Sequence, residues 1–334
     1  MQALLAPLKE LAEYDEVRKI VRQGKGTVAL SGCVDSQKLH MIYGLSDGLK
    51  YKVIVTYNDL KAKEIYEEYR FYDRNVMLYP AKDLIFFQAD IHGNQLVQER
   101  IKTLRRVVEG KPVTIVTTYA ALMTPQVLWE EKDIIHTERG GSLDESKLAS
   151  RLVAMGYEKA YQVESPGQFS VRGGIVDIYC LTEENPWRIE LWGDEIDSIR
   201  SFDPESQRSL ENLEELTIYP AVEHIGDKDM VSFLDYFPEE RTIIFLDEPN
   251  RLTEKGGAVE EEYRQSRMHR EEKGSRNLPE NWLCSFEQLQ KELNKRNCIS
   301  VCALEPKQAG WKVREKFYLE VKSISAYNNS FELL

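Results

Sequence analysis

Residues 168–179 read QFSVRGGIVDIY, a stretch that predicts two short β-strands joined by a tight turn. The two glycines after Arg172 mark a place where the backbone turns sharply or comes close to another group. The residues that follow supply a mostly apolar strand in which Asp177 is the one polar step. The two strands are therefore expected to be joined through Arg172 and the glycines.

A further strand pattern lies at residues 187–192, WRIELW. Side chains alternate between the two faces of a strand, so its isoleucine and leucine belong to one face and Arg188, Glu190 and Trp192 to the other. This alternation predicts an antiparallel sheet with one face open to solvent, charged and aromatic.

Residues 1–132 alternate strand and helix patterns, which is typical of a parallel sheet with right-handed crossovers. Strands are expected at 27–32, 51–56, 76–80 and 113–117, and helices at 4–22, 36–45, 59–71 and 94–109.

The pattern changes at residue 133, and residues 133–221 are expected to form a small α+β domain. Its helix is predicted at 144–155, with Leu148, Leu152 and Val153 on the apolar face and Gly156 after the end. Residues 222–334 form a third part that returns to the first sheet, with strands expected at 241–249, 298–302 and 318–321 and a charged helix at 254–272.

The turn after the first strand lies where a phosphate-binding P-loop would sit. A working P-loop needs G-x-x-x-x-G-K-[ST], because glycines let backbone N–H groups approach phosphate, lysine neutralises it and the hydroxyl holds Mg²⁺. Gly32 and Lys38 remain, but Gln37 replaces the second glycine, Leu39 replaces the hydroxyl residue and Asp35 adds an anion. The pattern predicts a scaffold without a working nucleotide site, in which Lys38 is a solvated helix residue.

Asp247 and Glu248 end a predicted strand and have the position of a Walker B motif, whose carboxylates hold Mg²⁺ in helicases. Without a working P-loop they have no nucleotide to act on, so they are interpreted as remnants. Gly32, Lys38, Asp247 and Glu248 thus form a vestigial nucleotide site. No Ser/His/Asp or Cys/His pattern supplies another catalytic chemistry, so no catalytic residue and no cofactor are predicted.

The net charge of −12 and the pI of about 5.2 disfavour autonomous DNA binding, since the chain as a whole repels phosphate backbones. Lys102, Arg105 and Arg106 form the best local basic patch, but a solvated helix face explains them more simply.

Five cysteines without a CxxC pair favour a reducing cytosol, and a cytoplasmic location is expected. Cys298 and Cys302 lie four residues apart with no histidine nearby, so no metal site is predicted. No apolar run approaches ~18 residues, so no membrane span is expected.

Residues 163–179, followed by 193–200 and 203–209, resemble the N-terminal region of bacterial transcription-repair coupling factors, which is itself similar to the excinuclease subunit UvrB. The resemblance extends over essentially the whole chain. It implies an α/β fold with a degenerate P-loop, in which a helicase-like parallel sheet domain is built from two sequence segments around an inserted small α+β domain. It also implies an N-terminal fragment of a longer, ATP-driven DNA translocase.

The resemblance further implies that the small domain binds the excinuclease subunit UvrA. The family's partner-contacting positions fall on Arg172, Arg188 and Trp192, where the family often has phenylalanine in place of the tryptophan. Arginine and tryptophan are also the usual hot-spot residues of interfaces. RNA polymerase and double-stranded DNA would be bound by other domains of the full-length protein.

The predicted function is a non-catalytic adaptor that recruits UvrA to RNA polymerase stalled at a lesion. The alternative is a UvrB-like or helicase-like domain with residual ATP or DNA binding. UvrB carries a long DNA-probing hairpin in its first domain, but here the segment 81–94 and the following helix leave no room for one. Phe86 and Phe87 could stack on bases, although such a pair more often belongs to a core.

Overall fold

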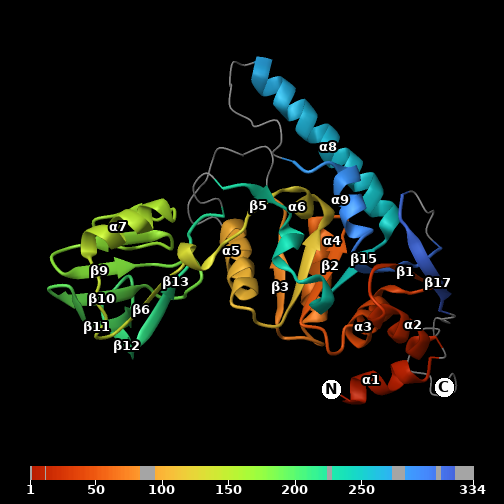
Figure 1. Cartoon of the computed structure of the whole chain (residues 1–334), viewed down its shortest axis with the longest axis horizontal. Helices are drawn as coiled ribbons and strands as arrows, with labels where there is room; N and C mark the ends of the chain where they lie inside the picture. The colour runs from red at the N-terminus through yellow and green to blue at the C-terminus, as the bar shows by residue number, and fades with distance from the viewer. Residues whose placement is uncertain are drawn as a thin grey trace, which may run out of the picture.

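The computed structural model describes residues 2–11, 13–82, 95–223, 228–272, 283–305 and 310–319. Within these ranges the chain forms a parallel sheet covered by helices, with a smaller sheet domain to one side of it (Figure 1). The predicted α/β fold with two sheet-containing parts is confirmed. Phe86 and Phe87 lie outside the described residues.

The large sheet has seven strands, all parallel, in the order β17-β1-β16-β15-β2-β4-β3. Both ends of the chain contribute, because strands from the C-terminal third lie on either side of β1 and beside β2. The bounds are β1 (Gly26–Ser31), β2 (Tyr51–Thr56), β3 (Val76–Tyr79), β4 (Val113–Thr118), β15 (Thr242–Asp247), β16 (Asn297–Val301) and β17 (Val313–Tyr318).

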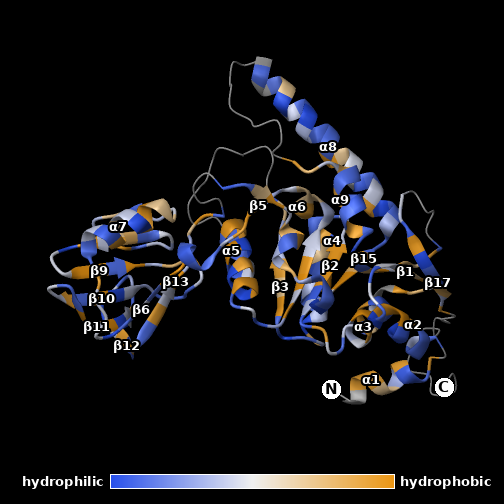
Figure 2. Ribbon diagram, in the orientation of Figure 1, coloured by the Kyte–Doolittle hydropathy of each residue, from blue (hydrophilic) through white to orange (hydrophobic). Residues whose placement is uncertain are grey.

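Helices cover both faces of this sheet, so its strands are apolar nearly throughout. Ile54 of β2 packs into a cluster with α1 (Gln2–Lys9), α2 (Tyr14–Arg22), α3 (Asp35–Leu45) and α4 (Asp59–Tyr69). Its neighbours Val53 and Val55 face the opposite cluster, with α5 (Gln95–Val108), α6 (Tyr119–Met123), α8 (Pro249–Glu272) and α9 (Phe286–Leu293). The single helix predicted at 4–22 is wrong, since α1 and α2 are separate helices. Figure 2 shows the mostly hydrophilic α8 extending beyond the sheet.

The small domain packs α7 (Glu145–Ala154) on one face of a six-stranded sheet of order β12-β11-β10-β9-β8-β7. Leu148 and Leu152 enter its core, but Val153 is 58% exposed, so the prediction for Val153 is wrong. One residue turns an α-helix by about 100°, which carries Val153 off the stripe of the two leucines. The bounds are β7 (Glu158–Lys159), β8 (Gln168–Val171), β9 (Ile175–Ile178), β10 (Trp187–Trp192), β11 (Glu195–Phe202) and β12 (Ser209–Leu213).

The chain enters and leaves the small domain through two strands that pair with each other. β6 (Ile135–Glu138) and β13 (Glu215–Ile218) form an antiparallel pair, and β5 (Gln126–Val127) pairs with β14 (Met230–Val231). Short 3₁₀ helices lie at Glu131–Asp133, Phe233–Tyr236 and Glu239–Arg241. The domain boundaries near 132/133 and 221/222 stay predictions.

Helix α5 connects the two parts of the molecule. Arg105 donates to Glu109 at 2.8 Å, pairs with Glu183 of the small domain, and lies over the ring of Tyr219. Arg105 is therefore an inter-domain contact, and its prediction as a solvated residue is wrong. No helix in the described ranges is both long and apolar enough to cross a membrane.

Candidate functional site

The turn between β8 and β9 holds Arg172 in a fixed backbone geometry. Gly173 and Gly174 have φ of +56° and +83°, the left-handed values that both central residues of a type I′ hairpin turn require. The amide of Arg172 donates to the carbonyl of Ile175 at 2.9 Å, and the amide of Gly174 donates to Glu145 of α7 at 3.1 Å. The glycine pair thus closes a two-residue turn that α7 anchors.

Asp177 forms ion pairs with two arginines on the open face of the small sheet. It lies opposite Arg188 in the β9–β10 register. Arg188 binds it at two points, Nε to Oδ1 at 2.6 Å and Nη2 to Oδ2 at 2.8 Å, and Arg172 donates from Nη2 to Oδ2 at 2.7 Å. The pairing of the strands therefore brings Arg172 and Arg188 together, although the Asp177 carboxylate is buried between them.

Trp192 ends β10 on the same face as Arg188, because the two residues are four apart on one strand. Its side chain is 84% exposed. Between them Glu190 accepts hydrogen bonds from Ser198 at 2.7 Å and from Arg200. An exposed aromatic residue thus adjoins a row of paired charges, as predicted from the alternation of WRIELW.

The pairing on this face favours the charged forms of Arg188 and Glu190. Hydrogen bonding from Arg188 to Asp177, reinforced by the charge of that carboxylate, raises the arginine's pKa against the opposing effect of burial. Hydrogen bonding from Ser198, aided by Arg200, lowers the pKa of Glu190 despite its partial burial. The surface therefore presents fixed charges near neutral pH.

The vestigial nucleotide residues also meet, at the carboxyl ends of β1, β2 and β15. Lys38 of α3 is buried, with Nζ 3.0 Å from Asp247 Oδ1 and 2.6 Å from Glu248 Oε1. Thr56 donates to the other Asp247 oxygen at 2.8 Å. The prediction that Lys38 is a solvated helix residue is wrong, because two carboxylates surround its ammonium group and replace its water.

Gly32 lies in the same turn, but the space beside it is occupied. It has φ of +82°, and a Cβ placed there would lie 2.2 Å from the carbonyl oxygen of Leu319. The amide of Leu319 donates to Ser31 at 2.8 Å, and the amide of Cys33 donates to the carbonyl of Cys302 at 3.0 Å. The loop that would hold phosphate is therefore bonded to the chain itself.

Sequence reasoning missed the groups that complete both sites. Asp177 was noticed only as a polar step, although a lone carboxylate in an apolar strand is itself a signal that a cation pairs with it. Thr56, which bonds Asp247, carries no such signal. Within the described residues, no group of three or more His, Cys, Asp or Glu side chains could hold a metal ion.

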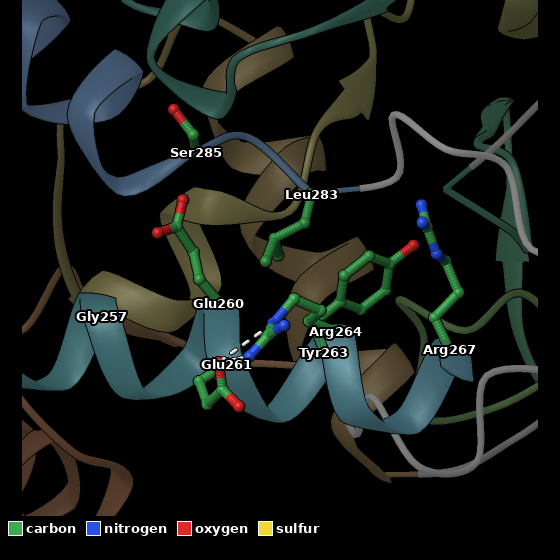
Figure 3. Close-up of a pocket in the computed structure, with 8 residues that line it drawn as sticks. All are labelled: Gly257, Glu260, Glu261, Tyr263, Arg264, Arg267, Leu283 and Ser285. Carbon is green, nitrogen blue, oxygen red and sulfur yellow. Dashed lines mark hydrogen bonds and ion pairs between the residues drawn. The ribbon is translucent and has the colours of Figure 1, made fainter. Parts of the chain in front are cut away.

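A separate pocket of about 450 Å³ lies along α8 (Figure 3). Its charged residues already bind groups of the chain: Arg264 pairs with Glu261 at 2.6 Å, and Glu260 accepts from the amide of Phe286 at 2.7 Å. The pocket's polar groups are thus engaged within the chain, and none of the predicted site residues lines it.

Comparison with known proteins places the candidate surface in a named domain. Residues 135–224 match the family described as the UvrB interaction domain. The chain is 34% identical over 224 residues to the transcription-repair-coupling factor of Bacillus subtilis (strain 168), covering 65% of this chain and 19% of that protein. It is 32% identical over 242 residues to that of Staphylococcus aureus (strain MRSA252), covering 70% and 20%.

The resemblance to the coupling factors is thereby confirmed over 65–70% of the chain, less than the whole-chain resemblance that was expected. The chain spans about a fifth of the length of these relatives. Residues 135–224 match the UvrB interaction domain family, and about two thirds of the chain is similar to about a fifth of the length of transcription-repair-coupling factors, at 32–34% identity.

Proposed function

We propose that this chain is a non-catalytic adaptor module whose small domain binds the repair protein UvrA. As part of a longer protein it would recruit UvrA to RNA polymerase stalled at a DNA lesion, with the polymerase and double-stranded DNA bound by other domains. The observation that carries the proposal is the convergence of Arg172 and Arg188 on Asp177, within the domain that matches the UvrB interaction family. The strand that carries Arg188 ends at the exposed Trp192.

This surface has the composition of an interface centre. Arginine and tryptophan dominate hot spots because each combines a large apolar contact area with directional donors. The surface also lies on paired strands, which hold it more rigidly than a loop would.

Removing Arg172 and Trp192 together, as Arg172→Ala/Trp192→Ala, is expected to weaken UvrA binding by about 2 kcal/mol or more, roughly 30-fold in Kd. Both side chains are exposed enough for truncation to leave the core intact. Arg188 is kept, because its loss would leave the buried Asp177 without its main partner. Isothermal titration of purified UvrA measures the effect.

The matched control is Arg70→Ala/Phe71→Ala, which removes an exposed arginine and an exposed aromatic residue from the large domain. It should bind UvrA as the parent does. Equal losses in the two double variants, or parental affinity in Arg172→Ala/Trp192→Ala, would contradict the assignment of this surface.

The nucleotide-binding alternative requires that Lys38 be available to bind phosphate. We expect ATP with Mg²⁺ to leave the melting temperature of the chain unchanged, because the lysine is neutralised by Asp247 and Glu248 and Gly32 faces Leu319. A ligand that binds only the native state raises the melting temperature as its concentration exceeds Kd. A concentration-dependent rise, measured by scanning calorimetry, would support the alternative.

A further inference from the structure

The buried Asp177 lies beneath the proposed UvrA surface and makes two hydrogen bonds with Arg188 but one with Arg172. Arg188 is bound at both carboxylate oxygens, donates to Gln207 at 3.0 Å, and lies with its guanidinium carbon 4.4 Å from the centre of the Phe202 ring. Its side chain is only 14% exposed. Most of its binding capacity is therefore used within the domain.

Arg172 is more available. Its side chain is 37% exposed, and among the described residues it makes one side-chain hydrogen bond, from Nη2 to Asp177. A guanidinium carries five N–H donors in a fixed plane, so Asp177 orients this group while leaving donors for another acceptor. The type I′ turn already fixes its backbone, so side-chain rotation is the main freedom that Asp177 removes.

The charges of Arg172, Asp177 and Arg188 indicate which kind of acceptor on the partner would bind the remaining donors of Arg172. Two guanidinium groups share one carboxylate, so these three side chains together carry one net positive charge. A carboxylate matches the remaining fork of Arg172 in charge and in planar geometry.

We propose that Asp177 is a positioning residue that holds Arg172 ready for a carboxylate on the partner, and that Arg188 acts through Asp177 rather than by direct contact. This inference rests on the proposed function, since it assigns roles within the same surface. Holding a long side chain in its bound geometry beforehand reduces the entropy lost on association. An effect of about three- to tenfold in Kd follows from immobilising one such side chain.

A double-mutant cycle tests this coupling. Asp177→Asn should weaken UvrA binding about three- to tenfold in the parent chain, but should add nothing once Arg172→Gln is present. The Arg172→Gln variant should also show a weaker salt dependence of Kd, because it loses a screened ion pair with the partner. A purely structural role for Asp177 would weaken both backgrounds equally, and that result would overturn the inference.

A matched control is Asp73→Asn, which alters a carboxylate of the large domain bonded to Thr114 at 2.7 Å and Lys52 at 3.2 Å. It should lower the melting temperature without changing Kd. If Asp177→Asn does not fold, Arg188→Lys replaces it in the cycle, because lysine keeps the charge but loses the two-point bond. Equal weakening by Arg188→Lys in both backgrounds would likewise overturn the inference.

The outcomes separate the two proposals. Absence of UvrA binding by the parent chain contradicts the proposed function. Binding that depends on Arg172 and Trp192 but not on Asp177 contradicts the positioning role alone.

Discussion

Replacing Lys38 by methionine should lower the free energy of unfolding of the parallel-sheet domain by about 3–5 kcal/mol, the usual cost of breaking a buried ion pair from one side. Methionine has a side-chain volume close to that of lysine, but the substitution leaves Asp247 and Glu248 beside each other without their cation. Asp247 is buried, so water cannot replace the lost charge. Urea unfolding followed by circular dichroism measures the change.

Two comparisons isolate the buried charge as the cause. Lys147→Met removes an exposed lysine paired with Asp144 on the small domain and should cost no more than about 0.5 kcal/mol. The triple change Lys38→Met/Asp247→Asn/Glu248→Gln should recover much of the loss, because no unpaired charge remains. A Lys38→Met chain as stable as the parent would show that the three groups are solvated, as a working nucleotide site requires.

The pH dependence gives a second readout of the same pair. Burial lowers the pKa of Lys38, but attraction by Asp247 and hydrogen bonds to both carboxylates outweigh burial and raise it above 10.5. A folded-state pKa above the unfolded one means that the stabilisation is complete below about pH 10 and is lost as pH rises through the folded value. The Lys38→Met chain should lack this alkaline loss.

The sequence was sufficient for features that depend on local pattern. The strand at Tyr51–Thr56 follows from a short run of apolar residues between polar ones, and the open face of β10 follows from strict alternation. The degenerate P-loop was readable because its chemistry requires particular residues at fixed spacing.

Features that depend on register or on distant chain segments could not be read in this way. The pairing of Arg188 with Asp177 depends on which residues of β9 and β10 lie opposite, and many registers satisfy the same alternation. Lys38 pairs with Asp247 and Glu248 across 209 and 210 residues of sequence, and nothing in the pattern of its helix distinguishes a buried lysine from a solvated one. The insertion of β16 between β1 and β15 likewise pairs distant segments, since Gly26 lies opposite Asn297.

Arg100 is another residue whose role only the fold reveals, and Arg100→Met should destabilise the chain by about 3–5 kcal/mol. The side chain is almost completely buried, with Nε and Nη2 bound to the two oxygens of Glu223 at 2.7 and 2.8 Å. Nη1 donates to the carbonyl of Pro80 at 2.6 Å, and Nη2 donates to Tyr79 at 2.6 Å. Its loss would leave a buried carboxylate, a carbonyl and a phenol with fewer donors.

The geometry also predicts that Arg100→Lys fails to restore stability, because one ammonium group cannot reach both oxygens of Glu223 together with Pro80 and Tyr79. Lys102→Met, an exposed position on the same helix, should be nearly neutral. Glu223 follows the last strand of the small domain, so this cluster joins that domain's exit to α5 and β3. Thermal unfolding monitored separately in the two domains tests this role. Because Arg100 is expected to couple the domains, Arg100→Met should reduce the cooperativity between their two unfolding transitions. If Arg100→Met destabilises only one domain, Arg100 contributes to local packing rather than to the junction.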